Sequence, residues 1–105
     1  MSEENKVPNY WTRYSKTDHN KLRHNFLGSE TIEQNYSQSM QDMFVLSMLN
    51  GKRDGVYVEV GADLPRIVNN TYLLETEFDW TGVSFEWESD KVAYFNTIRK
   101  NQCLL

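Results

Sequence analysis

Length, composition and charge restrict the chain to a small globular protein. It has 105 residues, of which 39% are hydrophobic and 25% are charged, and this balance is typical of one folded domain. The net charge of −4 provides no basic excess, which argues against nucleic acid as a partner. The single cysteine, Cys103, excludes an internal disulfide and indicates a reducing compartment. With no apolar run of membrane-spanning length and no secretion signal, we expect a cytoplasmic protein without a membrane partner.

Residues 1–38 are interpreted as a polar amino-terminal arm that precedes the main domain at 39–105. The arm lacks sustained hydrophobic periodicity. It carries a small aromatic cluster, made of Tyr10, Trp11 and Tyr14. These rings either dock on the domain or contact a partner, and the lack of a basic stripe favours docking. His19 and His24 have no cysteine or third histidine nearby, so we expect solvated surface histidines and no metal site.

A helix is predicted to begin near Ser39 and to end before Gly51. Ser39 as the N-cap, with Asp42 three residues later, resembles a capping box. Gly51 can adopt the left-handed conformation that commonly follows a helix. The helix also has an apolar stripe, which consists of Met40, Met43, Phe44 and Met48, widened by Val45 and Leu49. We expect this stripe to pack in the core.

The most informative stretch is the apolar run Val56–Val60, which ends in Gly61 and Ala62. Its β-branched and aromatic residues predict a strand, and the lack of polar alternation predicts burial on both faces of a parallel sheet. Gly61 permits close approach of the backbone to a ligand. Glu59 is the only acid in the run and lies near its carboxyl end, where open α/β sheets bind their ligands.

Two further helices and two further strands are predicted after this turn. Pro65 restrains the loop at 63–68, and either Asn69 or Asn70 caps the next helix. The apolar face of that helix contains Leu73, Leu74 and Phe78. A turn at 79–82 leads into a second strand at 83–86, which again finishes in an acid, Glu86.

The last predicted helix is capped by Ser89 or Asp90. Its apolar side contains Val92, Phe95 and Ile98. Arg99 and Lys100 follow at its carboxyl end, where their charges favour the helix dipole. A third strand then begins at Cys103.

Two strands that end in acids and are joined by a helix are typical of proteins that hold nucleoside cofactors. In such proteins the acid after the second strand binds the ribose hydroxyls, and Glu86 follows Gly61 by 25 positions, against roughly 20 expected. The glycine-rich G-x-G-x-x-G fingerprint is absent, which disfavours a nicotinamide or flavin oxidoreductase. S-adenosylmethionine has no phosphates and tolerates such a turn. A generic α/β pair with acids at its strand ends is the alternative interpretation.

Several motifs in this order resemble the amino-terminal half of FkbM-type methyltransferases. The matching stretches are Tyr36-Ser37-Gln38 with Gln41-Asp42, Tyr57-Val58-Glu59-Val60-Gly61-Ala62, Asn70-Thr71-Tyr72-Leu73-Leu74-Glu75, Trp80-Thr81-Gly82-Val83-Ser84-Phe85-Glu86 and Arg99-Lys100-Asn101. The resemblance covers residues 36–105. It implies a class I, Rossmann-like fold that uses S-adenosylmethionine, and methyl transfer to a hydroxyl of a sugar or another small molecule.

The resemblance also implies cofactor-binding roles for individual residues. Those concerned are Glu59, Gly61 and Ala62 in the first motif, Asn70 and Thr71 at the next helix start, and Glu86 and Trp87 after the second strand. Glu86 would hold the ribose. Trp87 would either stack on the adenine or pack on the third helix. Leu64 and Pro65 stand where many members have an acid and a glycine, and Trp87-Glu88 replaces a proline that often follows the ribose acid.

The family's fold contains further strands beyond those recognised here, so we expect only a partial Rossmann-like sheet that stops at the start of the third strand. The chain is then a truncated gene, one piece of a split protein, or a domain completed by another chain or by self-association. No catalytic base can be assigned, because Glu59, Asp63 and Glu88 are candidates by position only. A non-catalytic remnant or interaction module with weak nucleoside binding is the second functional hypothesis.

Overall fold

The computed structural model describes residues 26–105 of the chain. A short 3₁₀ helix at Ser29–Thr31 precedes the regular elements, which are α2 (Gln41–Met48), β1 (Val56–Val60), α3 (Tyr72–Phe78), β2 (Thr81–Phe85), α4 (Ser89–Ile98) and β3 (Cys103–Leu104). The predictions made for the aromatic cluster at residues 10–14 and for His19 and His24 lie outside the described residues. Among the described residues, no helix has the length and apolar character needed to cross a membrane.

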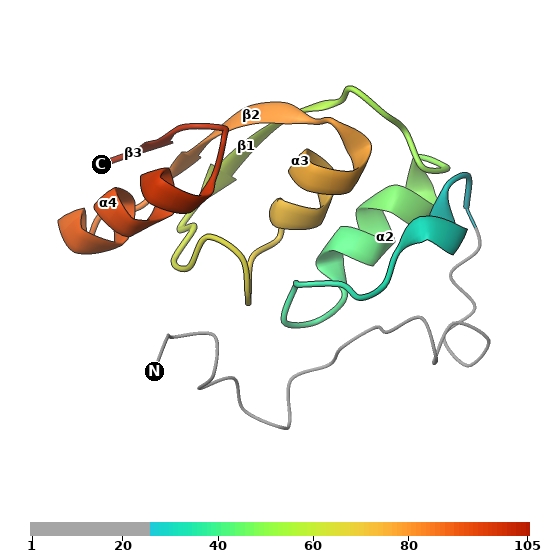
Figure 1. Cartoon of the computed structure of the whole chain (residues 1–105), viewed down its shortest axis with the longest axis horizontal. Helices are drawn as coiled ribbons and strands as arrows, with labels where there is room; N and C mark the ends of the chain where they lie inside the picture. The colour runs from blue at the N-terminus through green and yellow to red at the C-terminus, as the bar shows by residue number, and fades with distance from the viewer. Residues whose placement is uncertain (1–25) are drawn as a thin grey trace.

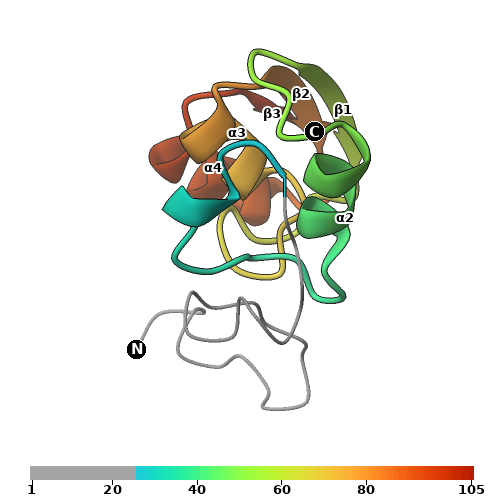
Figure 2. The same cartoon turned by 90° about the vertical axis from the view of Figure 1, so that its right-hand side faces the viewer.

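The three strands form one parallel sheet in the order β1-β2-β3. Val56 of β1 lies opposite Thr81 of β2, and Phe85 of β2 lies opposite Leu104 of β3. Helices α3 and α4 connect successive strands, and α2 lies beside α3 on the same side of the sheet (Figures 1 and 2). The predicted α/β fold, with a parallel sheet, flanking helices and a short third strand, is confirmed.

The two faces of the sheet differ sharply in burial. In β1, Tyr57 and Glu59 are buried on the helical side. The alternate side chains face away from the helices, and Val56, Val58 and Val60 are 76%, 68% and 82% exposed. The prediction that this strand is buried on both faces is therefore wrong for the described chain, because all three helices cover the same face. We call the uncovered side the open face.

The main core lies between the covered face of the sheet and helices α2 and α3. It contains Phe26, Ile32, Met43, Leu46, Tyr57, Leu73, Leu74, Phe78 and Trp80. Phe26 and Ile32 precede residue 39, so core packing extends into the segment that the sequence assigned to the polar arm. A smaller cluster of Ala62, Phe95 and Cys103 lies under α4.

Helix α2 departs from its prediction in both its start and its buried face. Met40, with φ of 65°, is the N-cap, and no side chain caps the helix. Asp42 cannot complete a capping box with Ser39, because its buried carboxylate accepts the backbone N–H groups of Tyr36 and Ser37. Three members of the predicted apolar stripe, Phe44, Met48 and Leu49, are exposed. The helix buries Met43 as predicted, and also Asp42 and Leu46. The predicted end is confirmed, since Gly51 has φ of 68°.

Helix α3 begins at Tyr72, and Thr71 rather than Asn69 or Asn70 is its N-cap residue. The Oδ1 atom of Asn69 nevertheless accepts the N–H groups of Thr71 and Tyr72, at 2.8 and 2.9 Å. The predicted apolar residues Leu73, Leu74 and Phe78 are all buried. The turn expected at 79–82 is shorter than predicted, because β2 already begins at Thr81.

Helix α4 has Glu88 at its N-cap, so neither Ser89 nor Asp90 takes that position. Of the predicted apolar side, Phe95 is buried and Val92 packs against it, whereas Ile98 is exposed.

Trp80, which the sequence placed in the turn before the second strand, is buried and donates its indole N–H to the carbonyl of Lys52.

Candidate functional site

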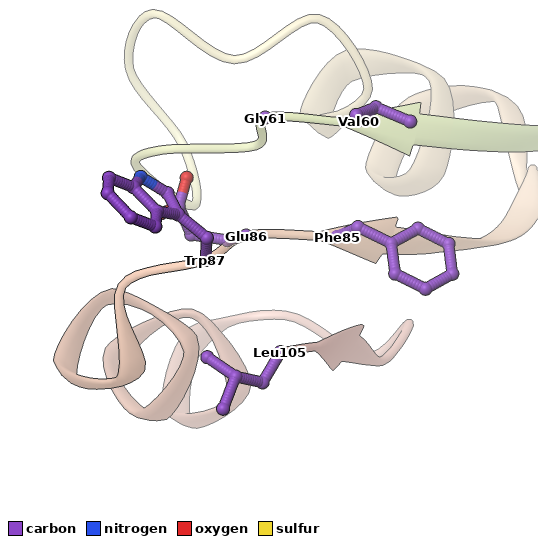
Figure 3. A pocket seen from close by; sticks show the side chains of 6 residues that line it. All are labelled: Val60, Gly61, Phe85, Glu86, Trp87 and Leu105. Atoms are coloured by element: carbon purple, nitrogen blue, oxygen red, sulfur yellow. The ribbon is translucent and has the colours of Figure 1, made fainter.

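A pocket of about 380 Å³ opens at the carboxyl ends of the three strands (Figure 3). Its lining residues are Val60, Gly61, Phe85, Glu86, Trp87 and Leu105. Pockets of this size, about 300–1,000 Å³, hold small molecules in many proteins. Three residues that the sequence singled out, Gly61, Glu86 and Trp87, are thus brought together here.

The wall on the β1 side is a tight turn. Gly61 has φ of 75°, and the N–H groups of Gly61 and Ala62 both donate to the carbonyl oxygen of Phe85, at 2.8 and 3.0 Å. A Cβ atom placed on Gly61 would meet no other atom within 4 Å, so the turn borders open space. Ala62 itself does not line the pocket, because it is buried under α4.

Glu86 is 7% exposed, and its carboxylate joins the loops that follow β1 and β2. Oε1 accepts the N–H of Asp63 at 3.1 Å, and Oε2 accepts the N–H of Glu88 at 2.8 Å. The ammonium group of Lys91 then binds the side chains of the same two residues, Asp63 and Glu88. Hydrogen bonds to these two carboxylates raise the pKa of Lys91 above its ordinary value. We call these four residues the Glu86 clamp, and it fixes one side of the pocket to the other.

Trp87 lies between the two clamp residues Glu86 and Glu88 and is 87% exposed. Its indole lines the pocket instead of being buried against α4. An exposed ring at a pocket wall can stack on a flat ligand or face a cation.

Glu59, also expected at the cofactor, lies elsewhere. Its side chain is buried on the helical side of the sheet, and its Oε1 accepts hydrogen bonds from the hydroxyls of Ser84 at 2.8 Å and Thr71 at 3.0 Å. Thr71 is likewise buried, and Asn70 is exposed just before α3. Of the predicted site residues, Gly61, Glu86 and Trp87 therefore line the pocket, whereas Glu59, Ala62, Asn70 and Thr71 do not.

A buried polar network on the helical side was missed by the sequence reasoning. Its centre is Arg99, which the sequence placed at the carboxyl end of the last helix and whose side chain is fully buried. The guanidinium pairs with Glu75 at 2.8 Å and lies 4.7 Å from the centre of the Phe95 ring. It also donates to the hydroxyls of Tyr57 and Thr71 at 3.0 and 2.9 Å. A lone arginine after a helix carries no sequence signal that separates this role from a solvated one.

Asn69 connects this network to the loop beside the pocket. Its Oδ1 accepts a hydrogen bond from Arg99 at 3.1 Å. Its amide nitrogen donates to the carbonyls of Leu64 at 2.9 Å and Ala62 at 3.4 Å, and Arg99 itself donates to the carbonyl of Pro65 at 2.8 Å. The loop that leaves Gly61 is thus held by buried hydrogen bonds rather than by apolar packing alone.

The remaining lining residues, Val60, Phe85 and Leu105, were expected only as strand residues. Nothing in the sequence marks them as ligand contacts beyond their places at strand ends. Within residues 26–105, no group of three His, Cys, Asp or Glu side chains is arranged to hold a metal ion.

Fold and site together define a small α/β protein with a parallel sheet and a pocket at the carboxyl ends of its strands. Neither a family model, nor a curated protein, nor a solved structure matches the chain. The chemistry of the pocket and the residue motifs are therefore what bear on function.

Proposed function

We propose that the chain is the amino-terminal part of an FkbM-type, S-adenosylmethionine-dependent methyltransferase with a partial Rossmann-like sheet. The observation that carries the proposal is that Gly61, Glu86 and Trp87, from the ends of two adjacent parallel strands, line one pocket. Ligands of doubly wound sheets bind at this edge. The ordered motifs shared with that family add the identity of the cofactor.

The pocket residues fit the nucleoside part of this cofactor. Each carboxylate oxygen of Glu86 accepts one backbone N–H, which leaves each oxygen a lone pair for a ribose hydroxyl. Trp87 offers an exposed ring to the adenine, and Gly61 leaves open space beside β1. When bound, the cofactor supplies the methyl group, and the acceptor in this proposal is a hydroxyl of a sugar or another small molecule.

Glu59, Asn69 and Thr71 take a supporting role in this proposal. Thr71 and the amide of Asn69 both donate to the Glu59 carboxylate, and Asn69 also binds the loop after Gly61. These residues fix the position of the turn that faces the cofactor. Glu86 is the one titratable residue among those lining the pocket, so no catalytic base is assigned within the described residues.

A second candidate is an interaction module that binds nucleosides without transferring a methyl group. The open face favours it, because three exposed valines form an apolar strip along β1. In the methyltransferase proposal, a completing chain or a second copy covers this strip. Both candidate functions use the same pocket to bind a nucleoside, and only the methyltransferase transfers a methyl group.

Titration calorimetry with S-adenosylhomocysteine tests the pocket. Hydrogen bonds to a charged group contribute about 1.5–3 kcal/mol, so Glu86→Ala should weaken binding at least about tenfold. Asp90→Asn is the matched control, because it also removes one negative charge, at an exposed position in the first turn of α4. This variant should bind S-adenosylhomocysteine like the parent. Equal affinities of Glu86→Ala and the parent would remove Glu86 from the site.

A radiolabelled methyl-transfer assay separates the two candidates. We expect no turnover by this chain alone, and turnover once a partner covers the open face. Turnover by a monodisperse monomer, lost in Glu86→Ala, would contradict the need for a completing chain.

A further inference from the structure

Two elements expose apolar side chains on different sides of the molecule. One is the open face of the sheet. The other is α2, whose Phe44 and Met48 are 63% and 68% exposed and lie one turn apart on the same side of the helix. Single exposed apolar side chains are common, but contiguous apolar surfaces mark contact with another molecule.

The open face is apolar across the width of the sheet and carries no charge. Residues that lie opposite each other in adjacent strands have their side chains on the same face. The valines of β1 therefore adjoin side chains of β2, and β2 adjoins β3 in the same way. The pairs are Val56 with Thr81, Val58 with Val83, Val60 with Phe85, and Phe85 with Leu104. Parallel sheets are normally covered by helices on both faces, so a helix is the element that fits this surface best.

Helix α2 has a matching outer surface. Its exposed side chains carry no charge, because the one ionisable residue of the helix, Asp42, is fully buried. Helices α3 and α4, by contrast, expose Glu77 and Asp90. Phe44 and Met48 have the i, i+4 spacing with which amphipathic helices anchor in apolar surfaces. Of these three helices, α2 is therefore the one whose outer side can cover the valines without removing a charge from water.

The two surfaces cannot meet within one molecule. Helix α2 lies beside α3 on the helical side of the sheet, and the open face is the opposite side (Figures 1 and 2). A symmetric contact between two open faces would leave Phe44 and Met48 in water. A contact between α2 of one copy and the open face of the next removes both apolar surfaces from water, so it is the more favourable arrangement.

We propose that copies of this chain associate head to tail, with Phe44 and Met48 of one copy packed on Val56, Val58 and Val83 of the next. The contact lies along the strands and leaves the pocket at their carboxyl ends free. It does not depend on methyl transfer. Because it joins two different surfaces, a dimer still has one surface of each kind uncovered, and association can continue beyond the dimer.

Complementation between two lysine variants tests this contact. Phe44→Lys disrupts the helix surface and leaves the open face intact, and Val58→Lys does the reverse. In sedimentation experiments on the full chain, each variant alone should have a dissociation constant at least about tenfold higher than the parent, as expected for the loss of a central anchor. An equimolar mixture should form a one-to-one complex that grows no further, because each copy has one intact surface.

Two further variants serve as controls. Thr76→Lys adds the same charge at an exposed position on α3 and should associate like the parent. Urea unfolding checks that each variant is folded, and Met48→Lys replaces Phe44→Lys if the latter is not.

Three results would overturn the proposal. Association of a helix-surface variant like the parent would restrict the contact to the open face or its edge. A mixture of the two variants that stays monomeric would show that the two surfaces do not bind each other. A parent that stays monomeric at every concentration would leave both surfaces to a different protein.

Discussion

Arg99 and Glu75 form an ion pair at 2.8 Å inside the protein, with side chains that are 0% and 6% exposed. The pair joins the residue after α4 to the middle of α3, so it ties together the two helices that connect the strands. Glu75 also accepts the backbone N–H of Lys100 at 3.0 Å. Through Asn69 the same guanidinium reaches the loop beside the pocket, and the stability of the fold is coupled in this way to the shape of the site.

Arg99→Met should therefore be severely destabilising. It leaves the Glu75 carboxylate buried without a countercharge, a change that typically costs about 3–5 kcal/mol. Urea unfolding measures the loss. The matched control is Arg53→Met, which breaks an exposed pair with Asp79 and should cost less than about 1 kcal/mol.

The double variant Glu75→Leu, Arg99→Met refines this prediction. It removes both charges together, so it should recover part of the stability lost in Arg99→Met. A double variant less stable than the single one would indicate that the hydrogen bonds that Glu75 accepts from the Tyr57 hydroxyl and the backbone N–H of Lys100, rather than the ion pair, dominate at this position.

Two glycines with positive φ should respond differently to alanine. At Gly61 the φ of 75° costs about 1–2 kcal/mol for an L-residue, but the added Cβ meets nothing within 4 Å. At Gly51 the Cβ would lie 1.8 Å from the carbonyl oxygen of Leu27, so the backbone must move. We expect Gly61→Ala to remain folded. Gly51→Ala should lower the free energy of unfolding by more than the about 0.5–3 kcal/mol that is typical of destabilising point mutations.

Gly61 also allows a test of the pocket. Gly61→Val places a β-branched side chain at a φ of 75°, which costs more than alanine does there. Because the space around the Cβ is open, we still expect a folded variant, and its side chain should obstruct a ligand in that space. Circular dichroism checks that the variant is folded, and calorimetry with S-adenosylhomocysteine checks that it has lost ligand binding. Retained binding by a folded Val variant would show that the turn is structural only.

Alkaline pH should destabilise the protein in two stages. Burial raises the pKa of the Cys103 thiol above its ordinary value of 9.0, and burial likewise raises the pKa of Tyr57 above 10.0. The unfolded chain then releases these protons at lower pH than the folded one. Stability is accordingly intact below the unfolded pKa and falls as pH rises through the folded pKa.

Urea unfolding between pH 7 and pH 11 measures this dependence, with Cys103→Ala as the control. The Ala variant should lose the stage that begins near pH 9.0 and keep the later one. A parent whose free energy of unfolding does not change across this range would contradict the assignment.

The sequence predicted the fold better than it predicted the surroundings of individual side chains. The run Val56–Val60, the turn at Gly61 and the apolar residues of α3 were all found where periodicity and turn chemistry put them. The site was predicted in part, since Glu86 and Trp87 reach the pocket while Glu59 does not. Position along the chain explains the difference, because Glu86 and Trp87 follow the end of β2, whereas Glu59 lies inside β1 and its side chain is buried on the helical side.

What the sequence could not predict depends on tertiary partners. Asp42 looked like half of a capping box, but a loop that precedes the helix uses its carboxylate. Arg99 was expected to favour the dipole of the last helix, but its side chain pairs with Glu75, which lies 24 positions earlier in the chain. The burial of β1 on both faces was inferred from composition, and composition does not say which element covers each face.

The last prediction concerns the open face. Val56, Val58 and Val60 expose an apolar strip on β1, and within the described residues this strand pairs only with β2, so its outer backbone groups remain a template for another strand. We expect the parent chain to associate in a concentration-dependent way in sedimentation experiments. Val58→Lys places a charge in the middle of the strip and should yield a monomer, with a stability change within about 0.5 kcal/mol because the side chain already lies in water.

Thr76→Lys is the matched control for this variant. It adds the same charge at an exposed position on α3, on the other side of the sheet, and should associate like the parent. If both lysine variants became monomeric, added charge alone would account for the effect and not the valine strip. A parent that stays monomeric at every concentration would contradict self-association through the open face. If Val58→Lys loses association and Thr76→Lys does not, β1 is identified as the contact surface, because Val58 is exposed and lies on the edge strand.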